Sequence, residues 1–223
     1  MSIVLSIHKW EKFSILKIRE DAMGIYINPD LMEAMGRMDL LGKNVIDGGS
    51  SIGLFSLYLS KRVGKRGRVY AFEIQPVINE LAIDNATLNN RTNITFHNKA
   101  ISDKSGNKVG FTHIDYTQQN ISSVGIKTEP ALRGESHCGE VETMALDDLN
   151  IENVGLIKLD LEGNEPKALD GMWETIDRCK PYLIVELSPT YLENKEQETI
   201  DKIISHGYSV KELSDCNYVF EPI

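Results

Sequence analysis

The chain has 223 residues, a length that fits one α/β domain with additions. Its 33 acidic and 24 basic residues give a net charge of −9, which disfavours long nucleic acid and anionic membrane surfaces as partners. The three cysteines are widely spaced and form no Cys-x-x-Cys pair, so neither a zinc site nor a disulfide framework is indicated. Because no apolar run approaches the ~20 residues that span a bilayer, we expect a cytoplasmic protein.

Residues 1–42 precede the main pattern, and we expect them to be an N-terminal extension that packs on the core. Within this extension, Asp30 is placed to cap a helix over residues 31–41, which Gly42 would end. Residues 43–223 are expected to form one domain, since no linker, repeat or low-complexity tract interrupts them.

From residue 44 onward, short apolar strands alternate with helical patterns. Such alternation predicts a parallel sheet covered by helices on both faces. The expected helices are 54–62, 76–88, 166–178 and 191–205. The expected strands are 44–47, 69–72, 94–101, 108–114, 141–146, 156–161, 182–187, 208–213 and 218–220.

The segment 115–140 departs from this alternation because it is polar and has no clear periodicity. A segment of this length inside a compact domain is usually functional or disordered, and we keep both interpretations. If it is a substrate loop, its planar amides and its aromatic ring suit a hydroxylated acceptor. The candidate acceptor contacts are Tyr116, Gln118, Gln119 and Asn120.

The stretch N-V-I-D-G-G-S-S-I-G, residues 44–53, has the pattern of a buried strand, a tight glycine turn and the start of a helix. Glycines in such a turn let a ligand lie against bare main chain. The phosphate-binding fingerprint Gly-x-Gly-x-x-Gly is incomplete, because Ser50 stands at its middle glycine. Asp47 closes the strand, and its carboxylate favours a cationic ligand over a pyrophosphate.

Four apolar strands each end in an acid: Asp47, Glu73, Asp160 and Glu186. Ligands of open parallel sheets bind outside the carboxyl ends of the strands, so these positions are candidates for a site. Any one of them alone is equally compatible with capping the next helix. Glu73 lies 20 residues after Gly53, the general spacing of the carboxylate that binds ribose hydroxyls.

Six stretches in this order resemble the FkbM family of S-adenosylmethionine-dependent methyltransferases: V-I-D-G-G-S-S-I-G, V-Y-A-F-E-I-Q-P, N-K-A-I-S-D-K-S-G, V-E-T-M-A-L-D-D-L, L-I-K-L-D-L-E-G-N-E and P-Y-L-I-V-E-L. The resemblance covers roughly residues 40–190. It implies the class I methyltransferase fold, a Rossmann-like sheet of seven strands, mostly parallel with one antiparallel strand near its edge. It also implies O-methylation of a sugar or another small hydroxylated metabolite.

Carried over by position, the resemblance implies that the glycine turn binds the methionine part of S-adenosylmethionine, through Asp47, Gly48, Gly49, Ser50, Ser51 and Gly53. Glu73 and its neighbour Ile74 match the ribose position. Asn98, Ala100 and Ile101 would lie at the adenine. The chain departs from the family at Ser50-Ser51, where Ala-Asn is usual, and at Asn164, where Ala is usual.

Asp160 and Glu162 match the acidic pair beside the transferred methyl group. We expect one of them to act as general base or to orient the acceptor. Lys158 lies two residues before Asp160, on the same face of its strand, and is a candidate partner. A rival role for Asp160 is to hold the cofactor's ammonium group or the glycine turn.

Three alternative functions remain at this point. A non-catalytic scaffold that binds S-adenosylmethionine would carry the same cofactor residues. A nucleotide-dependent oxidoreductase would use the same sheet, but Ser50 and the acidic pair disfavour it. A nucleic-acid amino-methyltransferase usually carries Asn/Asp-Pro-Pro-aromatic where this chain has Asp160-Leu161-Glu162-Gly163.

Overall fold

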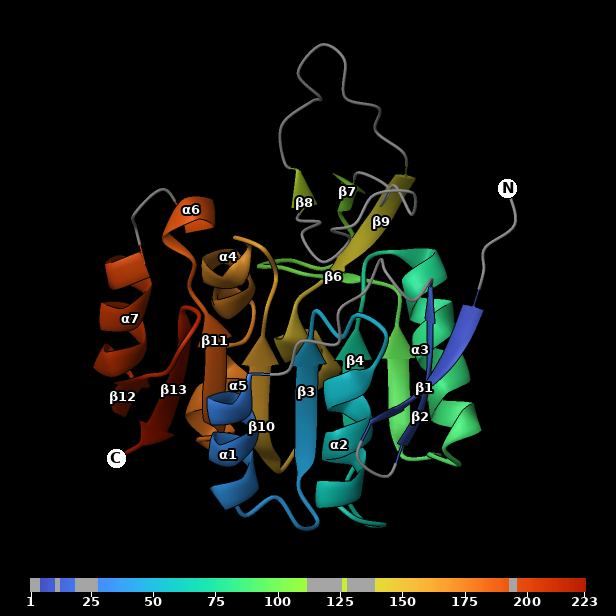
Figure 1. The fold of residues 1–223 in the computed structure, drawn as a ribbon. Helices are drawn as coiled ribbons and strands as arrows, with labels where there is room; N and C mark the ends of the chain where they lie inside the picture. The colour runs from blue at the N-terminus through green and yellow to red at the C-terminus, as the bar shows by residue number, and fades with distance from the viewer. Residues whose placement is uncertain (1–4, 11–12, 19–27, 112–125, 128–138, 193–195) are drawn as a thin grey trace.

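A seven-stranded sheet forms the centre of the computed structural model, which describes residues 5–10, 13–18, 28–111, 126–127, 139–192 and 196–223 (Figure 1). The strand order is β12-β13-β11-β10-β3-β4-β5. All neighbours pair in parallel except β13, which runs antiparallel to both β11 and β12. The predicted fold class is therefore confirmed. The strands are β3 (Asn44–Gly48), β4 (Val69–Phe72), β5 (Ile94–His97), β10 (Val154–Leu159), β11 (Tyr182–Glu186), β12 (Tyr208–Glu212) and β13 (Asn217–Pro222).

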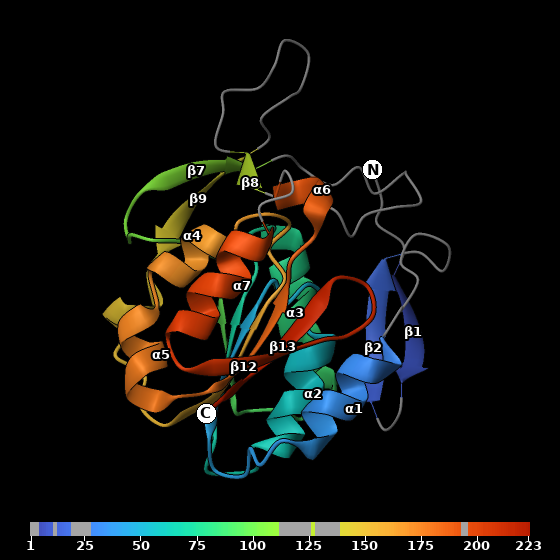
Figure 2. The same cartoon turned by 90° about the vertical axis from the view of Figure 1, so that its left-hand side faces the viewer.

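Helices cover both faces of this sheet, as Figure 2 shows edge-on. Successive side chains of a buried strand point to opposite faces, so Val45 packs with the α1 and α2 side and Ile46 with the α4, α5 and α7 side. This double burial explains why the central strands are apolar without alternation. The helices are α1 (Pro29–Arg37), α2 (Leu54–Arg62), α3 (Pro76–Leu88), α4 (Glu165–Asp170), α5 (Trp173–Cys179), α6 (Pro189–Leu192) and α7 (Glu196–Ser205).

Two predicted helices and one predicted strand are divided. The expected helix 166–178 breaks at Gly171, where an added Cβ would lie 2.1 Å from the Ser102 carbonyl oxygen of a distant segment. The expected helix 191–205 is α6 and α7, separated by residues outside the described part. The expected strand 94–101 ends at His97, because Ala100–Ile101 form β6 and pair with β9 in another sheet.

The cap of α1 also differs from the prediction. The side chain of Asn28, rather than that of Asp30, accepts hydrogen bonds from the main-chain N–H groups of Asp30 (2.9 Å) and Leu31 (3.3 Å). Asp30 instead lies in the first helical turn, where its charge still complements the helix dipole.

A second, four-stranded sheet lies beyond the carboxyl ends of the main strands (Figures 1 and 2). Its order is β6-β9-β7-β8, with β6 (Ala100–Ile101), β7 (Lys108–Phe111), β8 (Ile126–Lys127) and β9 (Gly139–Met144). A short 3-10 helix, Leu146–Leu149, leads from β9 into β10. Of the expected substrate loop 115–140, only β8 and the first residues of β9 are described. Tyr116, Gln118, Gln119 and Asn120 lie outside the described residues.

The first described residues form an antiparallel hairpin of β1 (Leu5–Trp10) and β2 (Phe13–Ile18). It lies against α3, where Asn89 accepts a hydrogen bond from the main-chain N–H of Ser14 (2.8 Å) and donates one to its carbonyl oxygen (2.6 Å). The division of the chain at residue 42 stays a prediction. In the ranges that the structure describes, no helix is long and apolar enough to cross a membrane.

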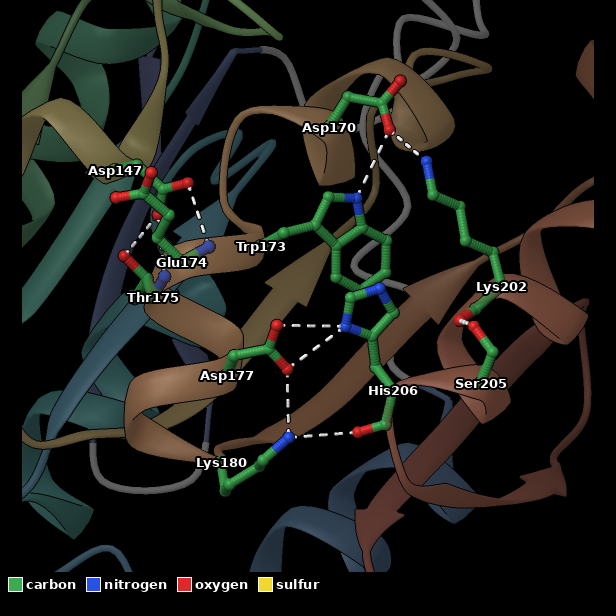
Figure 3. A network of polar contacts seen from close by, with 10 residues as sticks. All are labelled: Asp147, Asp170, Trp173, Glu174, Thr175, Asp177, Lys180, Lys202, Ser205 and His206. Atoms are coloured by element: carbon green, nitrogen blue, oxygen red, sulfur yellow. Dashed lines mark hydrogen bonds and ion pairs between the residues drawn. The ribbon is translucent and has the colours of Figure 1, made fainter.

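Charged and aromatic side chains of α5, α7, the end of α4 and the adjoining turns form a network on the outer surface (Figure 3). The Trp173 ring stacks on the His206 ring with centroids 4.0 Å apart. The His206 Nδ1 lies 3.1 Å from Asp177, which also pairs with Lys180 at 3.0 Å. We call this set the α5–α7 network; it comprises Asp170, Trp173, Asp177, Lys180, Lys202 and His206.

Candidate functional site

The glycine turn joins β3 to α2 at the carboxyl edge of the main sheet. The N–H groups of Gly49 and Ser50 both donate to the Phe72 carbonyl oxygen, at 3.0 and 2.9 Å, which ties the turn to the end of β4. Gly53 precedes α2 with φ 84°, and no side chain caps that helix. The turn therefore places bare main chain and a helix N-terminus beside the strand ends.

Gly49 is the point at which two loops meet. Its φ is 74°, and an added Cβ would lie 1.9 Å from the carbonyl oxygen of Asp160, closer than any real contact. The N–H of Asp160 in turn donates to the Gly48 carbonyl oxygen at 3.2 Å. The predicted cofactor turn and the predicted acidic loop are therefore in direct main-chain contact.

Asp47 is fully buried beneath the turn. Its Oδ2 accepts a hydrogen bond from the Ser56 hydroxyl at 2.5 Å, whereas its Oδ1 has no hydrogen-bond partner among the described residues. Burial raises the pKa of Asp47, and the nearby Lys158 ammonium works against that rise. Asp47 is therefore a buried carboxyl group with unused hydrogen-bonding capacity.

Lys158 is the predicted partner of Asp160, and the structure brings the two together. The Lys158 Nζ lies 3.2 Å from Asp160 Oδ2 and 4.9 Å from the centroid of the Phe55 ring. The Lys158 side chain is 2% exposed and that of Asp160 38% exposed, so the carboxylate faces outward from a buried cation. Burial lowers the pKa of Lys158, but Asp160 and Asp47 outweigh it and raise that pKa above its usual value.

Glu186 belongs to the same group; the sequence indicated it as one of the strand-end acids but assigned it no role. The parallel register pairs Lys158 with Ile184 and Leu159 with Val185, so Asp160 and Glu186 end adjacent strands side by side. Their side chains share a hydrogen bond. Burial and the Asp160 charge raise the pKa of Glu186 to about 9. Burial opposes ionisation of Asp160 too, but Lys158 and the bond to Glu186 bring its pKa below the usual value.

Glu162 lies in the loop after β10 with φ 53°, an uncommon conformation for a residue with a side chain. Burial raises its pKa, while a hydrogen bond with Tyr191 of α6 lowers it. The next residue, Gly163, has φ 100° and packs against Tyr191. The loop therefore holds a second, more basic carboxylate beside Asp160.

Glu165 is a further residue that the sequence interpretation did not include. Its buried carboxylate accepts hydrogen bonds from the N–H groups of Leu161 (2.5 Å) and Gly163 (3.0 Å). Burial raises its pKa to about 7, although these main-chain donors favour the ionised form. The side chain thus closes the loop that carries Asp160 and Glu162.

Glu73, the predicted ribose residue, follows β4 on the other side of the turn. Its two carboxylate oxygens accept hydrogen bonds from the N–H groups of Ser51 (3.0 Å) and Gln75 (2.8 Å). Burial raises its pKa to about 7 against the effect of these donors. Each oxygen retains a lone pair for a further donor such as a hydroxyl group.

The three residues predicted at the adenine have different surroundings. The Asn98 amide donates to the carbonyl oxygens of Glu73 (2.8 Å) and Ile74 (2.9 Å), so only its Oδ1 remains for a ligand. Ala100 and Ile101 are buried by protein. The Ile101 side chain packs behind Gly48, where an added Cβ would lie 2.9 Å from its Cδ1. Ile101 therefore supports the turn from behind, whereas Ala100 packs with Phe111 and Val141 of the second sheet.

Within the described residues, no group of three or more His, Cys, Asp or Glu side chains is arranged to hold a metal ion.

Curated relatives match this chain over different lengths. A protein named Methyltransferase 1 from Beauveria bassiana (strain ARSEF 2860) is 27% identical over 187 residues, which cover 74% of this chain and 72% of that protein. The ribosomal RNA large subunit methyltransferase E of Buchnera aphidicola subsp. Acyrthosiphon pisum is 38% identical over 87 residues, 34% of this chain. The chain spans only 42% of that second relative.

Solved structures share the fold. The methyltransferase FkbM of Methylobacillus flagellatus KT aligns with a TM-score of 0.58 at 18% identity, over 83% of this chain and 45% of that one. A SAM-dependent O-methyltransferase of Thermotoga maritima aligns with a TM-score of 0.52 at 16% identity, over 98% of this chain and 78% of that one. At these identities the likeness shows the fold alone.

Membership of a family follows from the match to a family model. The model of the methyltransferase FkbM domain matches residues 42–220, which include six strands of the main sheet, most of the seventh, β13, and both loops that meet at Gly49. The Rossmann-like sheet and the relatives named as methyltransferases agree with it. This chain therefore belongs to the FkbM family of methyltransferases.

Proposed function

We propose that the protein transfers the methyl group of S-adenosylmethionine to a hydroxyl oxygen of a small hydroxylated acceptor, a sugar being the first class to test. The observation that carries this proposal is the contact between Gly49 and the Asp160 main chain, because it joins the glycine turn to a loop of carboxylates. A protein of the same fold from Streptococcus mutans, with a TM-score of 0.52, was solved in complex with SAH, which supports this choice of cofactor.

The residues around the turn fit S-adenosylmethionine. Glu73 retains acceptor capacity for two vicinal ribose hydroxyls, and the Asn98 Oδ1 is available for an amino group such as that of adenine. Asp47, with its unpartnered Oδ1, contributes negative charge beneath the turn, where an ammonium group would be favoured. When bound, the cofactor supplies an electrophilic methyl group on a positively charged sulfur.

The two loop carboxylates suit different tasks. Asp160 has a lowered pKa because Lys158 and Glu186 stabilise its charge, so it is a weak proton acceptor and a good partner for a cation or a hydroxyl donor. Glu162 has a raised pKa and is therefore the better general base. We assign proton abstraction from the acceptor hydroxyl to Glu162 and the positioning of bound ligands to Asp160.

The charge of this edge also favours a small neutral acceptor. Among the described residues near the turn, Lys158 is the cation that the carboxylates Asp47 and Asp160 share. A polyphosphate chain would meet repulsion here, in addition to the net charge of −9. The Buchnera relative is named as a ribosomal RNA methyltransferase, so RNA still belongs in the acceptor panel.

Calorimetric titration with S-adenosylmethionine, and separately with NADH, tests the cofactor. We expect micromolar binding of S-adenosylmethionine alone and its loss in Glu73→Ala. Binding of NADH alone would support an oxidoreductase and overturn the proposal.

Transfer of isotope-labelled methyl groups to a panel of free sugars, nucleotide sugars, polyols and RNA then tests the acceptor. Labelling of a hydroxylated small molecule, lost in Glu162→Gln, is expected. Labelling of RNA alone would contradict the acceptor class. Cofactor binding without turnover on any acceptor would favour a non-catalytic scaffold.

A further inference from the structure

Glu186 is a strand-end acid to which the proposed reaction assigns no task. It ends β11 directly beside Asp160 at the end of β10, as the parallel register requires. Strand β11 lies between β10 and β13 in the sheet, and its main chain pairs with both of them. The backbone positions on either side of Glu186 are therefore fixed by this pairing. Its place beside Asp160 therefore follows from the sheet itself.

Two carboxyl groups form a hydrogen bond with each other only if one of them carries a proton. Asp160 already has a cation, since Lys158 lies 3.2 Å from its Oδ2. For Glu186, burial and the charges of Asp160 and Glu162 raise the pKa, and these effects outweigh the opposing effect of Lys158. The proton is therefore on Glu186, and the negative charge is on Asp160.

We propose that Glu186 is a positioning residue that works in its neutral form: its carboxyl group donates a hydrogen bond to Asp160 and, together with Lys158, fixes the carboxylate that contacts the bound cofactor. This inference rests on the proposed function, which gives Asp160 its ligand. Lys158 restrains one side of the carboxylate and Glu186 the other. Asp160 is thus oriented before any ligand binds, which reduces the ordering that binding requires.

The surroundings of Glu186 keep its proton in place over the ordinary pH range. Asp160 and Glu162, from the loop after β10, both disfavour a charge on Glu186, while Lys158 of β10 opposes them. In the turn before β13, burial and then the charge of Glu186 raise the pKa of the Cys216 thiol, so this group also belongs to the surroundings of Glu186. Because the pKa of Glu186 is about 9, the donated hydrogen bond is present at neutral pH and is lost as the pH rises through that value.

The proton can be tested without any ligand. Infrared spectra at pH 8 of the wild type and of Glu186→Gln should differ by the carbonyl band of one protonated carboxyl group. The matched control is Glu198→Gln, at an exposed position of α7, which should leave the band unchanged. No loss of the band in Glu186→Gln would overturn the proposal.

Thermal melting between pH 5 and 9 provides a second test. Since the folded pKa of Glu186 exceeds its ordinary value of 4.5, the wild type loses stability as the pH rises from 4.5 to about 9. Gln at position 186 removes this titration and keeps a donor. The melting temperature of Glu186→Gln should therefore rise relative to that of the wild type across this range, and a pH-independent difference would contradict the assignment.

Calorimetry with S-adenosylmethionine at pH 7.5 tests the positioning role. Glu186→Gln should bind within about threefold of the wild type, whereas Glu186→Leu, which has no donor, should bind about tenfold more weakly. Equal affinity of all three proteins, or equal losses in both variants, would overturn it. If Glu186→Leu does not fold, the decision rests on Glu186→Gln, which must retain its affinity at pH 7.5.

The two proposals fail in different ways. If the wild type does not bind S-adenosylmethionine, the proposed function fails, while the infrared band and the melting series still report whether Glu186 carries the proton. If the wild type binds and the band is absent, only the role of Glu186 is wrong.

Discussion

Two clusters of charged side chains in this protein are organised in opposite ways. In the α5–α7 network, which is largely exposed, Asp170 pairs with Lys202, and Asp177 pairs with Lys180 and His206 (Figure 3). The hydrogen bond from His206 is the main reason that the pKa of Asp177 is below its usual value. Every carboxylate of this network therefore has its own positively charged or hydrogen-bonding partner.

At the strand ends, by contrast, Lys158 is the one cation near Asp47, Asp160 and Glu186 among the described residues, and burial raises the pKa of Asp47 and Glu186. Buried carboxyl groups with raised pKa values cost the folded protein stability at neutral pH. Buried acids that share one cation do not stabilise the fold, whereas their negative charge is suited to binding a cationic ligand. The α5–α7 network is therefore organised to stabilise the fold, and the strand-end acids are organised in a way that suits a ligand.

The largest effect is expected at Gly49, where the two loops of the site meet. Gly49→Ala places a Cβ 1.9 Å from the Asp160 carbonyl oxygen and should lower the free energy of unfolding by about 4 kcal/mol. The control is Gly207→Ala beside the α5–α7 network, because Gly207 also has a positive φ, 86°, but no atom within 4 Å of an added Cβ. It should cost about 1 kcal/mol. Urea unfolding of both variants measures the difference, and equal losses would contradict the described contact.

Lys158 gives the next largest effect. Lys158→Met removes the buried cation and leaves Asp160 and Asp47 without compensation, which should cost about 3 kcal/mol of stability. Lys202→Met, in the exposed α5–α7 network, should cost less than about 1 kcal/mol. Denaturant midpoints at pH 7 test this pair, and a larger loss for Lys202→Met would reverse the comparison.

The affinity for S-adenosylmethionine should depend on the strand-end acids but not on the α5–α7 network. Glu73→Ala should weaken S-adenosylmethionine binding about a hundredfold, equivalent to about 2.7 kcal/mol, while Asp177→Ala leaves it unchanged. Because burial raises the pKa of Glu73 to about 7 and the ionised form accepts ribose hydroxyls, the affinity of the wild type should increase as the pH rises from 6 to 8. Calorimetry at several pH values measures both effects, and an affinity that falls over this range would contradict the assignment.

The smallest effect is expected within the α5–α7 network. Asp177→Asn should lower the melting temperature by about 1–2 °C at low salt and by less at high salt, because exposed ion pairs are screened. The lowered pKa of Asp177 means that its contribution is complete above pH 3.8 and is lost as the pH falls through the folded-state pKa. Calorimetric melting at two salt concentrations tests this, and a loss that is independent of salt would argue against an ionic contribution.

The sequence sufficed for the main sheet and for part of the site. Apolar strands that alternate with helices imply parallel pairing, and parallel pairing brings Asp47, Glu73 and Asp160 to one edge. The i, i+2 spacing of Lys158 and Asp160 predicted their contact, because side chains two apart share a face of a strand.

The parts that sequence did not predict depend on distant segments or on local backbone angles. The break at Gly171 arises from the close approach of Ser102, nearly seventy residues earlier. Glu165 reaches back to the N–H of Gly163 because the loop adopts positive φ at Glu162 and Gly163. The bond between Asp160 and Glu186 requires the register of β10 and β11, which an apolar pattern does not specify to the residue.

The contact at Gly49 has a consequence for how the two ligands of the enzyme affect one another. With no space for a methyl group between the glycine turn and the Asp160 main chain, the two loops cannot change conformation independently. In the proposed function, a cofactor that shifts the turn would therefore shift Asp160 and Glu162, the carboxylates proposed to act on the acceptor. By thermodynamic linkage, if the cofactor changes the affinity for the acceptor by some factor, the acceptor changes the affinity for the cofactor by the same factor. The absence of a side chain at Gly49 would thus couple the proposed cofactor site to the proposed acceptor site.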